Sequence, residues 1–170
     1  MITNLKLKFY GDKLLRKKST PVKTVGPTER MLITSMIKKM YESKGIGLAA
    51  PQVGINERIF VVDIGEGPIA VINPRIVKKR GREVMEEGCL CFPDISFRVK
   101  RAQKIVLKYL DENNNKVERG FDDLLARVMQ HEIDHLDGKL IIDYASWQEK
   151  LKYRKQLKEI RKINKENQGT

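Results

Sequence analysis

The feature that most constrains the fold is the hydrophobic periodicity of residues 122–135, because it predicts a helix with one face in the core. Asp122 is a candidate N-cap for this helix, and Gly138 is a candidate C-terminal stop. Arg127 and Asp134 are expected to lie away from the buried face. The buried stripe, at i, i+4, i+7 and i+11, consists of Leu124, Val128, His131 and His135.

The two histidines of this stripe are the only ones in the chain, and Glu132 follows the first of them. The run from Gln130 to His135 matches H-E-x-x-H, in which residues four apart project from one helix face and can reach one metal ion. Glu132 can then act on a water held by that metal, which indicates metal-assisted hydrolysis. The alternatives are a chance pair near the surface or hydrogen-bonded core histidines. Two histidines that flank a glutamate favour a ligand pair.

A catalytic metal site commonly has three protein ligands, and the chain has no third histidine. Its only cysteines are Cys89 and Cys91, which on an extended chain lie at the long limit for a disulfide, so a bridge between them is not expected. Gly88 allows close approach of the backbone, so we predict Cys89 as the third ligand. The alternative for Cys89 is a small buried hydrophobe, and Cys91 is interpreted as a packing residue.

A glycine-rich stretch, GIGLAAPQVG at residues 45–54, lacks the lysine and Ser/Thr of a P-loop. Its small residues suggest a backbone that lies close to a ligand, with the Gln52 amide as a donor. A plain turn after the preceding helix fits this stretch equally well.

Together these segments resemble the peptide deformylase family. The match consists of GIGLAAPQ at 45–52, EGCL at 87–90 and QHEIDH at 130–135, in the order of the family, and the similarity extends from about residue 11 to the C-terminal helix. Two departures are visible. Cys91 stands where the family's E-G-C-x-S motif has serine, and Lys13 replaces the proline of a G-D-P turn near the N-terminus.

The resemblance implies hydrolysis of the formyl group from N-formylmethionyl peptides, with release of formate. Cys89, His131 and His135 would hold one divalent metal ion, with Glu132 as the general base. Ferrous iron is the expected native metal, and Zn²⁺, Ni²⁺ or Co²⁺ are the alternatives.

The resemblance also assigns substrate contacts. The Gln52 amide and the Leu90 backbone N–H would stabilise the charge on the formyl oxygen. Arg127 stands where related enzymes often have an apolar residue, so the rim of the methionine pocket is expected to be more polar. The implied pocket walls and backbone contacts are Ile46, Leu124, Val128, Gly47 and Gly88.

The length of 170 residues fits one domain, with residues 1–146 as the catalytic part and 147–170 as a basic C-terminal helix and tail of the same domain. We expect an α+β fold of short, mostly antiparallel strands wrapped around the helix with the H-E-x-x-H motif. The predicted elements are a helix at 27–44, strands at 58–63, 69–77, 95–100 and 104–110, and a polar turn at 111–116.

A capping box from Ser146 to Glu149 predicts the start of the final helix, anchored by Leu151, Leu157 and Ile160. From residue 147 onward the chain has eight Lys/Arg against three Glu, a surplus of five within a net charge of +12. Such a helix is often simply a solvated face. The resemblance instead suggests a transient ribosome contact, without sequence-specific nucleic acid binding.

The absence of a long apolar run or leader, with two reduced cysteines, predicts a cytoplasmic protein without membrane contact. Two rival functions stay open. A zinc peptidase that cuts internal bonds would share H-E-x-x-H, although such enzymes usually take their third ligand from downstream. A ribosome-binding protein without catalysis would be expected to have a broken ligand set, whereas the set here is complete.

Overall fold

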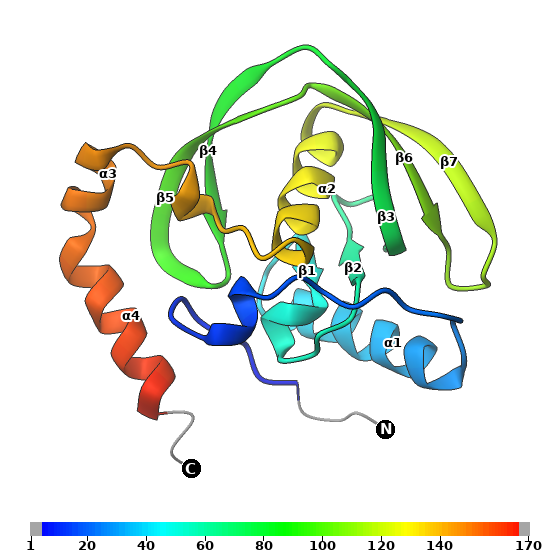
Figure 1. Ribbon diagram of the computed structural model, residues 1–170, viewed down its shortest axis with the longest axis horizontal. Coiled ribbons are helices and arrows are strands. Elements are labelled where there is room, and N and C mark those ends of the chain that lie inside the picture. Colours follow the sequence, from blue (N-terminus) through cyan, green and yellow to red (C-terminus); the bar gives the residue numbers. More distant parts are fainter. Residues whose placement is uncertain (1–4, 167–170) are drawn as a thin grey trace.

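The computed structural model describes residues 5–166, with side chains described through Asn164, and consists of two antiparallel sheets around the helix α2 (Asp123–Leu136) (Figure 1). The larger sheet has the strand order β1-β2-β3-β6-β7, and the smaller sheet pairs β4 with β5. All pairings between these strands are antiparallel. The predicted α+β fold, with strands around the motif-bearing helix, is confirmed.

The predicted strands all exist, but the sheets contain more. The strands are β1 (Gly47–Ala49), β2 (Ile59–Val62), β3 (Ile69–Arg80), β4 (Glu83–Cys89), β5 (Phe92–Arg101), β6 (Lys104–Leu110) and β7 (Lys116–Asp122). Of these, β1, β4 and β7 were not predicted. Most side chains of β4 and β7 are exposed, so these strands lack the apolar alternation that marks a half-buried strand. The polar turn between β6 and β7 is confirmed, with Asp111 accepting N–H bonds from Asn113 and Asn115.

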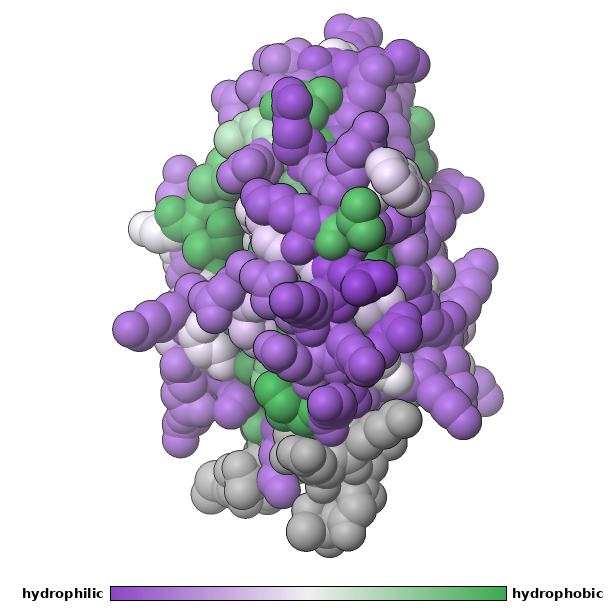
Figure 2. Space-filling model, turned by 90° about the vertical axis from the view of Figure 1, so that its left-hand side faces the viewer, coloured by the Kyte–Doolittle hydropathy of each residue, from purple (hydrophilic) through white to green (hydrophobic). Residues whose placement is uncertain are grey.

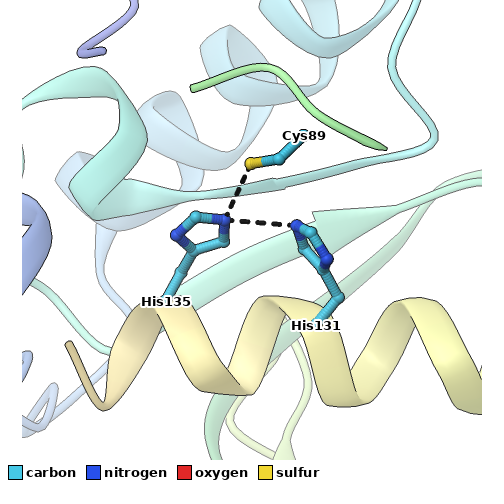
Figure 3. A group of neighbouring side chains, drawn as sticks. All are labelled: Cys89, His131 and His135. Atoms are coloured by element: carbon cyan, nitrogen blue, oxygen red, sulfur yellow. Dashed lines mark hydrogen bonds between the residues drawn. The ribbon is translucent and has the colours of Figure 1, made fainter. Parts of the chain in front are cut away.

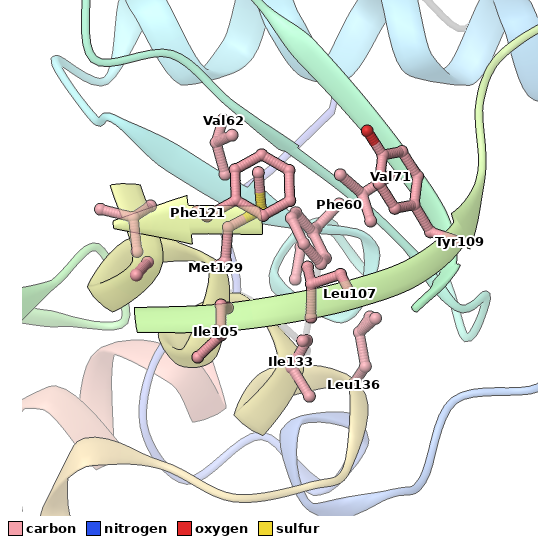
Figure 4. Packing of buried hydrophobic residues seen from close by; sticks show 13 residues of the cluster. Phe60, Val62, Val71, Ile105, Leu107, Tyr109, Phe121, Met129, Ile133 and Leu136 are labelled. Atoms are coloured by element: carbon pink, nitrogen blue, oxygen red, sulfur yellow. The ribbon is translucent and has the colours of Figure 1, made fainter. Parts of the chain in front are cut away.

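The helix α2 is held centrally because the larger sheet packs its apolar side chains against it. Phe60 from β2, Leu107 from β6 and Phe121 from β7 meet Met129 and Ile133 of the helix in one buried cluster (Figure 4). The N-cap position of Asp122 is confirmed, although its side chain makes no capping bond. Gly138, with φ of 72°, follows the C-cap as predicted.

The opposite face of the larger sheet is covered by α1 (Pro27–Glu42), which is two residues shorter than predicted. Leu32, Met36 and Met40 of α1 pack with Ile59 and Val61 of β2 in a second cluster. Because β2 lies between two helices, all four of its residues are buried, which explains its uninterrupted apolar sequence.

The C-terminal segment forms two helices, α3 (Trp147–Lys152) and α4 (Arg154–Glu166), instead of one. The capping box is confirmed, since Ser146 accepts the Glu149 N–H and Glu149 accepts the Ser146 N–H. Tyr153 separates the helices, and its ring packs edge-on against Phe97 at 5.5 Å between centroids.

This break changes which apolar residues anchor the segment. Leu157 and Ile160 of α4 are buried in a third cluster with Phe97 of β5, as predicted. The prediction for Leu151 is wrong, because it belongs to the first short helix and its side chain is 51% exposed. Among the described residues, no helix is long and apolar enough to cross a bilayer.

Candidate metal centre and active site

The two histidines project from adjacent turns of α2, and Cys89 reaches them from the end of β4 (Figure 3). The Nε2 atoms of His131 and His135 lie 3.2 Å apart, and Cys89 Sγ lies 3.2 Å from His135 Nε2. The three candidate ligand atoms all fall within 4.8 Å of one another. The predicted ligands are therefore brought together, although Cys89 and His135 are 46 positions apart in sequence.

This arrangement fits a tetrahedral metal ion. Two nitrogen ligands at ~2.1 Å from such an ion are separated by about 3.4 Å, close to the observed histidine spacing. A thiolate and two imidazoles suit zinc and first-row divalent metals. Burial raises the pKa of the Cys89 thiol to about 12, so metal binding must displace its proton.

Cys89 is positioned by a tight turn between β4 and β5. It pairs with Phe92, so only Leu90 and Cys91 form the turn, and the Cys91 N–H lies 3.5 Å from Cys89 Sγ. Cys91 is fully buried in the third cluster, consistent with the predicted packing role, but its sulfur also lies 3.6 Å from Gln52 Nε2. The two cysteines are free thiols.

Glu87 orients the first histidine, a role that the sequence did not reveal. Its Oε2 lies 3.1 Å from His131 Nδ1, which leaves Nε2 of that ring for the metal. Burial acts to raise the pKa of Glu87, but hydrogen bonds from His131 and Arg101 outweigh it and lower the pKa to about 2. Glu87 is therefore an ionised carboxylate beneath the metal ligands. Its place two residues before Cys89 in one strand was the only available signal.

Two arginines complete this buried network. Arg101 donates from Nε at 2.6 Å and from a terminal nitrogen at 2.9 Å to the Glu87 carboxylate, and it also binds Asp134 at 2.8 Å. Arg127 donates to Glu87 at 2.7 Å and is only 5% exposed. The prediction that Arg127 lies away from the buried face is wrong, because the smaller sheet covers that face and supplies a carboxylate partner.

The guanidinium of Arg127 also binds the backbone carbonyls of Val99 at 3.0 Å and Glu83 at 2.9 Å. Its charge is therefore directed into the β4–β5 sheet, although the side chain lines the same cavity as the ligands.

We expect Arg127→Leu to change selectivity among first side chains of the substrate less than twofold. It should lower the free energy of unfolding by about 3 kcal/mol, because the buried pair loses one partner. Denaturant unfolding measures the change in stability, and kinetics with peptides of different first residues measure the change in selectivity. A large selectivity change with unaltered stability would contradict this structural role of Arg127.

Glu132 lies beside the ligands with a free carboxylate oxygen. Its side chain is 3% exposed, and among the described residues Oε2 has no hydrogen-bond partner. Burial raises its pKa to about 7, so this carboxyl group can bind or release a proton near neutral pH. Gly47 of β1 makes room for this carboxylate, since a Cβ atom there would overlap Glu132 Oε1.

The glycine-rich stretch forms β1 and then a short 3-10 helix, Ala50–Val53, instead of a plain turn. Gln52 is 1% exposed, and its Oε1 accepts the Ala49 N–H at 2.6 Å. Its Nε2 lies 3.6 Å from the sulfurs of both Cys89 and Cys91. The predicted amide donor is therefore placed next to the metal ligands.

A cavity of about 920 Å³ opens in front of the site. Ile46 is 45% exposed at its edge and Val128 is buried at 7%. The predicted place of Leu124 in the buried stripe is wrong, because this residue also lies at the cavity edge and is 47% exposed. A Cβ atom added at Gly88 would meet no atom within 4 Å. The sequence-predicted residues that line the cavity are Ile46, Gly47, Gln52, Gly88, Cys89, Leu90, Leu124, Val128, His131 and Glu132.

Comparison with known proteins agrees with this site. The sequence model of the polypeptide deformylase family matches residues 5–151. The peptide deformylase of Thermotoga maritima is 46% identical over 156 residues, covering 91% of this chain and 95% of that protein.

Solved structures are similar in fold as well. The peptide deformylase of Legionella pneumophila matches with a TM-score of 0.87 and 38% identity, covering 93% of this chain and 95% of that one. The peptide deformylase of Thermus thermophilus matches with a TM-score of 0.88 and 35% identity, covering 93% and 98%. The chain therefore belongs to the peptide deformylase family, whose members are metal hydrolases.

Proposed function

We propose that the protein removes the formyl group from N-formylmethionyl peptides bound in this cavity, with Glu132 as the proton carrier. The observation that carries this proposal is the buried carboxylate with an unpartnered oxygen, set beside a Cys-His-His ligand group. When bound by Cys89, His131 and His135, a divalent metal supplies a water with a pKa lowered toward neutrality. The family expectation of Fe²⁺ stays a proposal, with Zn²⁺, Ni²⁺ and Co²⁺ as alternatives that the same ligands accept.

Glu132 takes a proton from the attacking water and later delivers it to the departing amine, which leaves formate and a free N-terminus. Burial of Glu132, which raises its pKa, favours its holding a proton between these two transfers. The Gln52 amide and the Leu90 backbone N–H donate to the formyl oxygen as charge develops there. Their positions at the cavity wall, beside Cys89, support this assignment.

The peptide is proposed to lie as an added strand along the cavity. β1 is the edge of the larger sheet, and β4 pairs only with β5 among the described strands, so Gly47 and Gly88 present free backbone edges to a ligand. The first side chain would enter between Ile46, Leu124 and Val128, whose apolar surfaces suit methionine.

Formate release from a formyl-Met-Ala-Ser peptide tests the reaction, with anaerobically purified protein loaded with Fe²⁺. We expect release from the wild type, no release from Cys89→Ala and no hydrolysis of the acetylated peptide. Because an acetyl group has an extra methyl at the scissile carbonyl, it serves as the matched control. Cleavage of an internal peptide bond would instead support the rival peptidase, and absence of any hydrolysis would support binding alone.

The second proposed partner is the ribosome, reached through residues 147–170 of the same domain as the catalytic part, 1–146. Figure 2 shows the side of the molecule with α3 and α4, on which hydrophilic residues predominate. The packing of Leu157 and Ile160 against β5 supports one domain. Residues 167–170 of this tail lie outside the described part. Among the side chains described through Asn164, the exposed basic residues of α4 are Arg154, Lys155, Lys158, Arg161 and Lys162.

These cations support electrostatic attraction to ribosomal RNA without sequence readout. We expect the triple change of Lys155, Lys158 and Lys162 to glutamate to weaken co-sedimentation with ribosomes more than about tenfold at low salt. Hydrolysis of short peptides should be unchanged. A matched triple reversal in β3, at Lys78, Lys79 and Arg80, controls for net charge; equal loss in both variants would contradict a contact specific to α4.

Free cysteines and the absence of a membrane-spanning helix among the described residues support the proposed cytoplasmic location.

A further inference from the structure

The thiol of Cys91 is not a metal ligand, but it can accept a hydrogen bond from the neighbouring Gln52. The side chains of both residues are almost completely buried, at 0% and 1% exposed. Gln52 Nε2 lies 3.6 Å from Cys91 Sγ, within the range of an N–H···S hydrogen bond. Cys91 is also held from the backbone, since its carbonyl accepts the Tyr10 N–H at 3.0 Å. The sulfur is therefore a fixed acceptor.

The amide of Gln52 is restrained at both of its polar atoms. Its oxygen is held by the Ala49 N–H at 2.6 Å, which leaves the two N–H donors of Nε2 to find acceptors. One sulfur on each side, Cys89 and Cys91, is within reach of that nitrogen. Cys89 is committed as a metal ligand, whereas Cys91 is not.

We propose that Cys91 is a positioning residue: its sulfur binds one N–H of Gln52 and thereby holds the other N–H on the side of Cys89, where the formyl oxygen is proposed to lie. This inference rests on the proposed role of Gln52 in catalysis. An amide pinned at its oxygen and at one N–H cannot rotate about its terminal bond, so its second donor points in one direction before the substrate arrives. Such preorganisation acts on the charge that develops during the reaction more than on substrate binding.

Cys91 is fully buried, whereas Gln52 lines the cavity. Cys91 belongs to the same cluster as Leu15, Phe92 and Phe97, all of which are almost fully buried. Removal of the sulfur would leave a space of one heavy atom with an unpaired amide N–H at its wall. The amide then keeps its bond from the Ala49 N–H but loses one of the two acceptors near its Nε2, so the direction of its second donor is held less firmly.

The test uses full-length, zinc-loaded protein in a double-mutant cycle of Cys91→Ala and Gln52→Ala. We expect Cys91→Ala to lower kcat about tenfold, with KM changed less than twofold and one zinc per chain retained. In the Gln52→Ala background, the same change should have no further effect. Cys91→Ser, which restores a small acceptor, should recover kcat to within about threefold of wild type.

A second readout does not depend on turnover. In ¹⁵N-labelled zinc protein, the side-chain amide signal of Gln52, assigned by its absence in Gln52→Ala, should shift or broaden in Cys91→Ala and recover in Cys91→Ser. Ile141→Val serves as the matched control, because it removes one buried carbon from the same cluster at a residue that does not line the cavity. It should lower stability and leave both kcat and this signal unchanged.

The outcomes separate the two hypotheses. A Gln52→Ala variant with wild-type kcat would overturn the role of Gln52, and the positioning role of Cys91 with it. If Gln52→Ala is impaired but Cys91→Ala is fully additive with it, loses zinc or leaves the amide signal unchanged, only the positioning role is overturned.

Discussion

Glu132→Ala is expected to lower the rate of deformylation on the order of 10³-fold while the protein keeps its metal. The carboxylate is the proposed proton carrier, and loss of a positioned acid–base group typically costs 10²- to 10⁴-fold. The metal should be retained because the ligand atoms come from Cys89, His131 and His135. The hydrogen bonds of these side chains run to one another and to Glu87 and Gln52. Formate release under saturating peptide gives the rate, and elemental analysis gives the metal content.

A matched control is Asp137→Asn, which alters another carboxylate at the end of the same helix, outside the cavity. Asp137 pairs with Arg58 at 2.8 Å, so its loss should affect stability slightly and catalysis little. Substantial residual turnover in metal-loaded Glu132→Ala would contradict the role proposed for this carboxylate.

Gly47→Ala is expected to lower kcat about 100-fold, although only one methyl group is added. The new Cβ would overlap Glu132 Oε1 and lie 2.9 Å from Val128 Cγ1. Because both neighbours are buried, the carboxylate must move, and a displacement near 1 Å in a catalytic group can cost on the order of 10²-fold. Steady-state kinetics with metal analysis measures the effect.

Gly88→Ala is the companion variant, since Gly88 faces the same cavity but a Cβ there meets no atom within 4 Å. Folding and metal content should be unchanged, and any effect should fall on KM, where the peptide backbone is proposed to lie. Wild-type kcat in Gly47→Ala would show that Glu132 does not need the space that this glycine leaves.

The parts of the site that were predictable share a local or a chemical signature. The period of residues 122–135 predicted α2, and the spacing of His131 and His135 predicted a ligand pair on one face. Cys89 followed from the lack of a third histidine and from Gly88 beside it in a chain with only two cysteines. Gln52 followed from the small residues before it, although its buried contacts with two sulfurs did not.

The parts that were missed depend on contacts between distant segments. Glu87 meets Arg101, Arg127 and His131 across sequence separations of 14, 40 and 44 residues. No local pattern marks a charge as buried when its partner lies on another element. For the same reason Arg127 was placed on the wrong side of its helix. Leu151 was misjudged because the helix breaks at Tyr153, whose ring contacts Phe97 of β5.

The metal site adds a further link between two parts of the chain that the Glu87 and Arg101 contacts already join. One ligand comes from the β4–β5 hairpin and two come from α2, and the bound ion would close a loop of 46 positions between Cys89 and His135. An ion that binds only the folded chain stabilises it by mass action, by ~2.7 kcal/mol at 100 times its dissociation constant. The cofactor is thus also a cross-link, so an enzyme stripped of its metal loses stability together with activity.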